Sequence, residues 1–178
     1  ENLLPPHVDL DDSTIEAVLS EAGKLADNHL APLNHFRDKN NPVLRQDNEV
    51  QTPEGFSEAF SRIAEGGWIG VASETHYEGM GLPGRMSAAI NEYWHGANMS
   101  FALCSLLTQG LIDAFTLVGT DDEKKTYLPK FNSGAWTGTM NMTEPQSGTD
   151  LATIKTKAKH DGQDWRIQGQ KICITYGE

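Results

Sequence analysis

One short stretch holds most of the side chains in this chain that could bind a polar ligand. Residues 142–153 read MTEPQSGTDLAT and combine several hydroxyl groups with Glu144, Pro145, Gly148 and Asp150. Two interpretations are open. The stretch could be an ordinary turn, in which Pro145 and Gly148 set the backbone. Alternatively, it could present hydroxyls and backbone N–H groups to a flat polar ligand or a pyrophosphate, a task for which Thr, Ser and Gly are suitable.

Composition excludes several other kinds of function. A formal net charge of -11 argues against nucleic-acid binding, which needs a cationic surface. The six His show no metal-ligand spacing, and Cys104 and Cys173 form no CxxC pair, so we expect no metal site and a reducing, cytoplasmic compartment. The Gly residues of YEGMGLPG (77–84) lack the strand and helix of a dinucleotide-binding motif. Residues 1–10 do not resemble a signal peptide, and no apolar run is long enough to cross a membrane.

Hydrophobic periodicity predicts helices up to about residue 133. The stretch 31–51 is polar and aperiodic, which is typical of a loop, and the stretch 99–118 is apolar on nearly all sides, which predicts a helix buried in a bundle. Thr120 and Glu123 have the spacing of a capping box. The predicted helices cover residues 13–29, 52–65, 85–97, 99–118 and 120–128.

The pattern changes to short strands after Gly134. The predicted strands cover 136–142, 154–159, 164–169 and 171–175. We therefore predict an α+β chain with a mostly α-helical domain at 1–133 and the first strands of a β domain at 134–178. So small a sheet is marginal unless it packs on something else.

The order of residues in several motifs resembles the acyl-CoA dehydrogenase family. MTEPQSGTD resembles the family's Thr-Glu-Pro loop, and GTDDEKKTYLPKF resembles the helix that leads into its middle domain. WRIQGQKICITYGE resembles its G-x-K-x-W-I-T-N strand, and GGWIGVASETHYEGMGLP resembles its GW step and following loop. ITYGE and the long loop at 31–51 are similar to a bacterial branch that includes 3-methylthiopropanoyl-CoA dehydrogenases.

This resemblance implies a fold and an activity. Family members have an N-terminal helical domain, a β-barrel-like middle domain and a C-terminal helical domain, of which the last is absent from these residues. They bind FAD, remove an α proton from an acyl-CoA, transfer the β hydride to the flavin and release a 2-enoyl-CoA, a reaction of fatty acid β-oxidation. They usually form homodimers or homotetramers and pass electrons to an electron-transfer flavoprotein or a similar acceptor.

The resemblance also assigns roles to individual residues. Thr143 matches the Thr that bonds the flavin ring, Thr149 matches the residue that bonds the pyrophosphate, and Thr175 lies near the hydride-accepting nitrogen. The full cofactor-binding set is Met140, Met142, Thr143, Thr149, Cys173 and Thr175. On the apolar helix, we expect Ala102, Leu103 and Leu106 to line the acyl pocket, with plain core packing as the alternative.

Several departures limit what the resemblance implies. Cys173 replaces an aromatic residue, Tyr176 replaces an Asn and Glu78 replaces a Gly. The family's catalytic base lies in the C-terminal domain, so no catalytic residue is predicted here, and we expect Glu144 and Asp150 to make structural hydrogen bonds. The chain alone should bind FAD weakly and be inactive. The alternatives are an acyl-CoA oxidase, a non-catalytic flavoprotein on the same scaffold, and a helical interaction domain without a cofactor.

Overall fold

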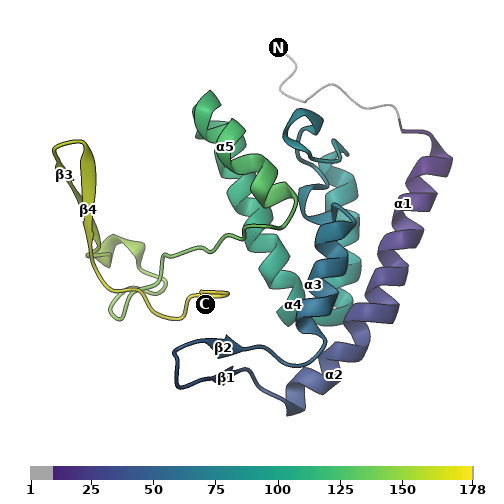
Figure 1. The fold of residues 1–178 in the computed structure, drawn as a ribbon, viewed down its shortest axis with the longest axis horizontal. Coiled ribbons are helices and arrows are strands. Elements are labelled where there is room, and N and C mark those ends of the chain that lie inside the picture. The colour runs from purple at the N-terminus through teal and green to yellow at the C-terminus, as the bar shows by residue number, and fades with distance from the viewer. Residues whose placement is uncertain (1–9, 178) are drawn as a thin grey trace. The chain divides into compact units, whose positions relative to one another are not determined.

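A computed structural model describes residues 10–177, apart from the Arg37 side chain, so most of the N-terminal stretch considered for a signal peptide lies outside it. The chain forms two compact units, a helical unit that ends at Gly138 and a smaller unit at Thr139–Gly177. Figure 1 shows the helices of the first unit and the hairpin of the second.

The first helical segment, which runs through three successive elements to Lys39, is longer than the sequence pattern predicts. Helix α1 (Asp12–Leu25) begins after Asp11, whose carboxylate accepts a hydrogen bond from the Thr14 amide at 2.7 Å, so Asp11 rather than Ser13 is the N-cap. A π-helical turn, η1 (Ala26–Leu30), then leads into α2 (Ala31–Lys39). The prediction of a loop over 31–51 is therefore wrong for 31–39. Packing of α2 on α4 outweighs the weak helix propensity of its polar residues.

The segment between α2 and α4 is compact and largely turn-like. Strands β1 (Val43–Leu44) and β2 (Val50–Gln51) form a small antiparallel pair. Helix α3 (Phe56–Glu65) has Gly55 as its N-cap, not Thr52, and ends at Gly66 as predicted. The turns η2 (Trp68–Gly70) and η3 (Thr75–Tyr77) follow.

The element α4 (Gly84–Val118) is two helical arms joined at Asn98, whose backbone is not helical. The Asn98 side chain accepts a hydrogen bond from the Phe101 amide at 3.1 Å and so caps the second arm. The arms fold back on each other, and Asn91 on the first arm donates a hydrogen bond to Gln109 on the second at 3.0 Å. The predicted division into helices 85–97 and 99–118 is confirmed.

By length and composition, α4 could cross a membrane, and it is the one such helix among the described residues. A core helix passes the same test, and the break at Asn98 divides α4 into two shorter arms. We infer no membrane role from it.

Helix α5 (Asp121–Asn132) begins with the predicted capping box, in which Thr120 and Glu123 exchange hydrogen bonds. The predicted end at Leu128 is wrong, because Pro129 lies inside the helix. A proline inside a helix removes one backbone donor and crowds the carbonyl one turn earlier, and burial of Leu128 and Phe131 holds the last turn against the core despite this cost.

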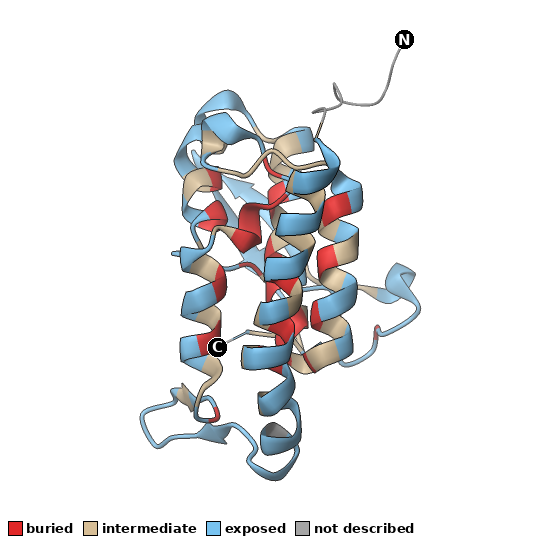
Figure 2. Cartoon of the chain, turned by 90° about the vertical axis from the view of Figure 1, so that its right-hand side faces the viewer, coloured by how far each residue is buried: buried red, intermediate tan, exposed pale blue. Residues whose placement is uncertain are grey.

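The hydrophobic core lies wholly within the helical unit and centres on α4 (Figure 2). Trp94 and Trp68 meet edge to face with ring centroids 6.1 Å apart. The prediction of a helix buried in a bundle holds for one face of the second arm, where Phe101, Ala102 and Ile112 are buried. Within the helical unit, Met99, Leu117 and Val118 are 61%, 81% and 85% exposed.

The second unit contains one antiparallel hairpin, β3 (Lys157–Asp161) and β4 (Asp164–Gln168), with Lys157 opposite Gln168. A short turn, η4 (Leu151–Thr153), precedes it. Strands are absent from 136–142 and 171–175 among the described residues, so both predictions are wrong there. A strand needs a hydrogen-bonded neighbour, and β3 and β4 pair only with each other.

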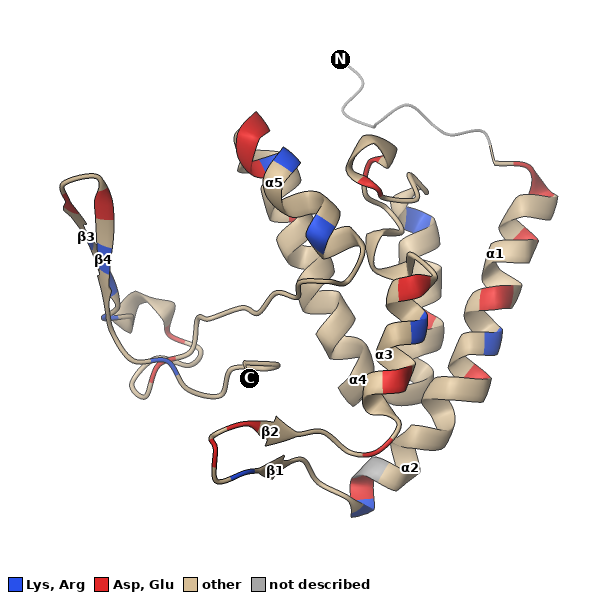
Figure 3. Ribbon diagram, viewed as in Figure 1, with Lys and Arg blue, Asp and Glu red and all other residues tan. Residues whose placement is uncertain are grey.

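Charge is divided unevenly between the units. Residues 139–177 contain five basic and four acidic residues, so the net charge of -12 on the remaining residues accounts for the chain's acidity. In Figure 3 several positions along α1 and α3 are coloured as acidic residues.

Candidate functional site

The loop at 142–156 is organised around the Glu144 carboxylate. Glu144 is only 3% exposed and accepts hydrogen bonds from the backbone amides of Lys155 at 2.7 Å and Thr156 at 3.0 Å. The Lys171 ammonium donates to the same carboxylate at 2.9 Å, and Gln146 donates at 2.5 Å. Glu144 therefore makes structural hydrogen bonds, as the sequence predicted.

These hydrogen bonds fix the ionisation of Glu144. The Thr156 side chain and then the Lys155 amide hold the pKa of the Glu144 carboxyl far below its usual range, against the opposing effect of desolvation. The residue is therefore an anion at any physiological pH and is a very weak base.

Most other polar side chains of the loop bond to the loop itself. The Ser147 hydroxyl donates to the Asp150 carbonyl at 2.8 Å, and the Asp150 carboxylate accepts from the Ala152 amide at 3.2 Å. The Thr153 hydroxyl contacts the carbonyls of Gln146 and Asp150. Glu144 and Ser147 also form a reciprocal backbone bridge. The turn is thus closed internally without help from a ligand.

The hydroxyls that the resemblance assigns to the cofactor do not take part in these bonds within the loop. Those of Thr143, Thr149 and Thr175 make no hydrogen bond to any residue that the structure describes. The backbone amides of Met140 and Met142 are likewise unpaired within the described chain, and both residues are exposed. Unused donors around an ordered turn fit a ligand with many acceptors, such as a flavin and its pyrophosphate.

A second segment, 171–175, lies beside the loop. The Ile172 amide donates to the Thr143 carbonyl at 3.1 Å, so Thr143 and Cys173 are brought close together. Cys173 is exposed and has a positive φ of 54°, which few non-glycine residues adopt and which ends any strand. Within this unit, the structure brings together the two segments that carry the predicted cofactor residues.

Lys171 is a site residue that the sequence analysis did not single out. Its ammonium joins the Met142 carbonyl at 3.1 Å to Glu144. The Lys of the G-x-K-x-W-I-T motif was the signal that could have pointed to it.

The residues predicted to line the acyl pocket lie in three environments within the helical unit. Ala102 is fully buried in the core, while Leu106 is 41% exposed and lines a cavity of 470 Å³ between the two α4 arms. Leu103 lies in a shallow hollow with Asn34 and Asp38 of α2. The assignment of these three residues to the substrate stays a prediction.

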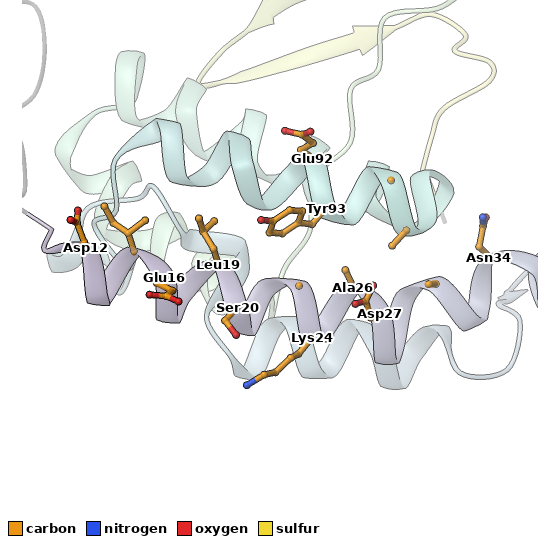
Figure 4. Close-up of a pocket in the computed structure, with 15 residues that line it drawn as sticks. Asp12, Glu16, Leu19, Ser20, Lys24, Ala26, Asp27, Asn34, Glu92 and Tyr93 are labelled. Carbon is orange, nitrogen blue, oxygen red and sulfur yellow. The ribbon is translucent and has the colours of Figure 1, made fainter.

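A wide groove of the helical unit contains none of the predicted site residues. It measures 1290 Å³ and lies between α1–α2 and the first arm of α4 (Figure 4). Leu19 and Tyr93 face it, and its acidic rim consists of Asp12, Glu16, Asp27 and Glu92.

The family model described as "Acyl-CoA dehydrogenase, N-terminal domain" matches residues 13–135. The chain belongs to the acyl-CoA dehydrogenase family. Its helical unit is the N-terminal domain of that family, and the residues after it begin the middle domain.

Individual relatives agree with this assignment. The chain is 40% identical to a 3-methylmercaptopropionyl-CoA dehydrogenase of Ruegeria pomeroyi over 96% of its own length and 29% of the relative. It therefore spans less than a third of that protein. An acyl-CoA dehydrogenase from Bacillus anthracis solved with FAD has the same fold at 23% identity, with a TM-score of 0.76 over 94% of this chain and 27% of the other. A glutaryl-CoA dehydrogenase solved with glutaryl-CoA gives a TM-score of 0.79 at 20% identity over 93% and 40%.

Proposed function

We propose that the protein containing this chain is an FAD-dependent acyl-CoA dehydrogenase. The reaction removes a proton from the α carbon and a hydride from the β carbon of an acyl thioester, so that a Cα–Cβ double bond forms. FAD, when bound, supplies the two-electron acceptor for that hydride. The observation that carries the proposal is a contrast within 142–175. The hydroxyls of Ser147 and Thr153 bond inside the loop, whereas those of Thr143, Thr149 and Thr175, which the family resemblance assigns to the cofactor, bond to no described residue.

The contribution of this chain is to bind and orient. The hydroxyls of Thr143 and Thr175 donate to the flavin ring, and that of Thr149 donates to the pyrophosphate. Fixed donors of this kind stabilise negative charge that develops on reduction, at no cost of reorganisation. The amides of Met140 and Met142 supply further donors beside the ring.

The catalytic base is supplied by sequence outside this chain. Glu144 is unsuited to the role, because its carboxylate is buried, already accepts several hydrogen bonds and has a strongly lowered pKa. Asp150 accepts a loop amide and is therefore also engaged in holding the turn.

Several further features belong to the same proposal. The substrate class is an acyl-CoA, and the relationship to the Ruegeria enzyme makes 3-methylmercaptopropionyl-CoA the first compound to test. Ala102, Leu103 and Leu106 contribute to the acyl pocket. An electron-transfer flavoprotein or similar carrier accepts the electrons, and the complete protein is a cytoplasmic homodimer or homotetramer.

The experiment is to purify the complete natural protein, measure its FAD content and titrate it anaerobically with 3-methylmercaptopropionyl-CoA, butyryl-CoA and glutaryl-CoA. We expect stoichiometric FAD and loss of flavin absorbance with at least one thioester. Peroxide release in air would identify the oxidase alternative. A protein that stays colourless after incubation with FAD would contradict the proposal.

A further inference from the structure

Lys171 ties two separate segments of the second unit together. Its ammonium donates to the Met142 carbonyl at 3.1 Å and to Glu144 at 2.9 Å, and the two side chains are 23% and 2% exposed. The next residue, Ile172, donates its amide to the Thr143 carbonyl at 3.1 Å. Residues 142–144 are therefore held by two consecutive residues of the segment that follows the hairpin in the sequence.

The Glu144 end of this pair is anchored independently. Its carboxylate also accepts the amides of Lys155 and Thr156, at the point where the loop leads into β3. Charge-assisted hydrogen bonds of this kind are among the stronger ones in proteins, and loss of one partner leaves a buried charge uncompensated. One ion pair thus fixes both ends of the 144–156 loop and the 171–172 segment.

The same contacts decide which polar groups remain available. Lys171 occupies the carbonyl of Met142 and Ile172 occupies that of Thr143, whereas the amides of these two residues bond to nothing among the described residues. The two carbonyls are therefore engaged by residues of this unit, whereas the two amides are available to a ligand. A surface that presents donors suits a ligand rich in acceptor atoms and negative charge.

We propose that the Glu144–Lys171 ion pair is a positioning element that engages the Met142 carbonyl, leaves the amides of Met142 and Thr143 available as donors, and thereby sets the affinity for the acceptor-rich flavin cofactor. Neither residue contacts the reacting atoms. The inference rests on the function proposed above and names the residues that shape its cofactor site.

Three substitutions in the complete natural protein test this inference. Lys171→Met removes the ammonium, Lys171→Arg retains a cation with several donors, and Lys157→Met removes the same charge from the exposed strand β3. The measurements are the Kd of the apoprotein for FAD, the absorbance spectrum of the bound flavin, and amide hydrogen exchange at Lys155, Thr156 and Ile172 without flavin.

We expect Lys171→Met to weaken FAD binding by about tenfold or more, to shift the flavin spectrum and to speed exchange at the three amides. Lys171→Arg should keep the Kd for FAD and the exchange rates within about threefold of those of the unaltered protein. Lys157→Met should leave the Kd, the spectrum and the exchange rates unchanged. If Lys171→Met fails to fold, the isosteric Glu144→Gln replaces it, with the same expectations.

Unchanged FAD affinity in Lys171→Met would overturn the inference. So would a uniform rise in exchange over the whole hairpin without rescue by Arg, because that result describes a merely structural lysine. If the unaltered protein binds no FAD, the proposed function fails as well, and exchange at Lys155 and Thr156 still decides whether the pair holds the loop.

Discussion

At the scale of single residues, the polar side chains of the 142–153 loop fall into two groups. Glu144, Ser147 and Thr153 bond within the loop, whereas Thr143 and Thr149 do not. Residue types alone could not separate the groups, because Ser and Thr serve equally well in turns and in ligand contacts. The order of residues in the motif assigns Thr143 and Thr149 to the cofactor, and that assignment stays a prediction.

Thr149→Val should weaken FAD binding without affecting the fold. The Thr149 hydroxyl is exposed and bonds to no described residue, so its loss removes a donor to the pyrophosphate and nothing internal. A single hydrogen bond to a charged group corresponds to roughly a tenfold rise in Kd, measured by flavin fluorescence titration. Thr126→Val is the control, because that hydroxyl bonds the Asp122 carbonyl within α5. Equal affinities for the Thr149 variant and the unaltered protein would contradict the role.

The order of the loop should depend on pH through Glu144. Because the pKa of Glu144 is lowered in the folded loop, the unfolded loop takes up the proton first as the pH falls. The stabilisation is therefore complete above the ordinary Glu pKa of about 4.3 and is lost progressively below it. Hydrogen-exchange protection factors of the Lys155 and Thr156 amides should fall below that pH. The same fall in Glu144→Gln, which has no such proton to bind, would show that another group is responsible.

At the scale of elements, Asn98 has the largest effect on the helical unit. It is fully buried, caps the second arm of α4 and donates to the Leu30 carbonyl in the π-helical turn at 3.2 Å. The sequence predicted two helices with a break between them, and the structure adds that the break residue also joins them to the first helix. Sequence periodicity contains no information about such a contact across 68 positions.

Asn98→Ala should destabilise the helical unit by about 2–4 kcal/mol, the sum of a lost N-cap and a buried carbonyl without a donor. The free energy of unfolding in urea, followed by far-UV circular dichroism, measures the loss. Ser100→Ala is the matched control, since it removes only the hydroxyl contact to Asn98 at 2.9 Å. A loss for Asn98→Ala no larger than that for Ser100→Ala would contradict the dual role.

At the scale of the whole molecule, the two units differ in how they are stabilised. All members of the hydrophobic core lie in the helical unit. In residues 139–177 the fully buried side chains are polar, Glu144 and Ser147, and Trp165 and Ile167 on the hairpin are 64% and 76% exposed. A two-stranded hairpin without an apolar layer is marginal in water.

A chain that ends at Gly138 should therefore keep its helix content and unfold in one cooperative transition. The separate peptide 139–177 should show neither stable structure nor flavin binding. Circular dichroism melts of both pieces check this expectation. A cooperative melt of the isolated peptide would show that the polar contacts around Glu144 suffice to hold it.

The sequence by itself determined the helical domain, the change to β structure in the last part of the chain, and the family, because periodicity and motif order are local properties of the chain. It placed the start of the β domain at residue 134, whereas the second unit begins at Thr139. It did not determine the helix at Ala31–Lys39, the incomplete pairing of 136–142 and 171–175, or the exposure of Leu117 and Val118. These features depend on which partner lies beside a segment, and a hydrophobic or alternating pattern is the same whether that partner is present or absent. The Glu144–Lys171 pair belongs to this second group, since only the folded chain brings residues 27 positions apart within a hydrogen bond.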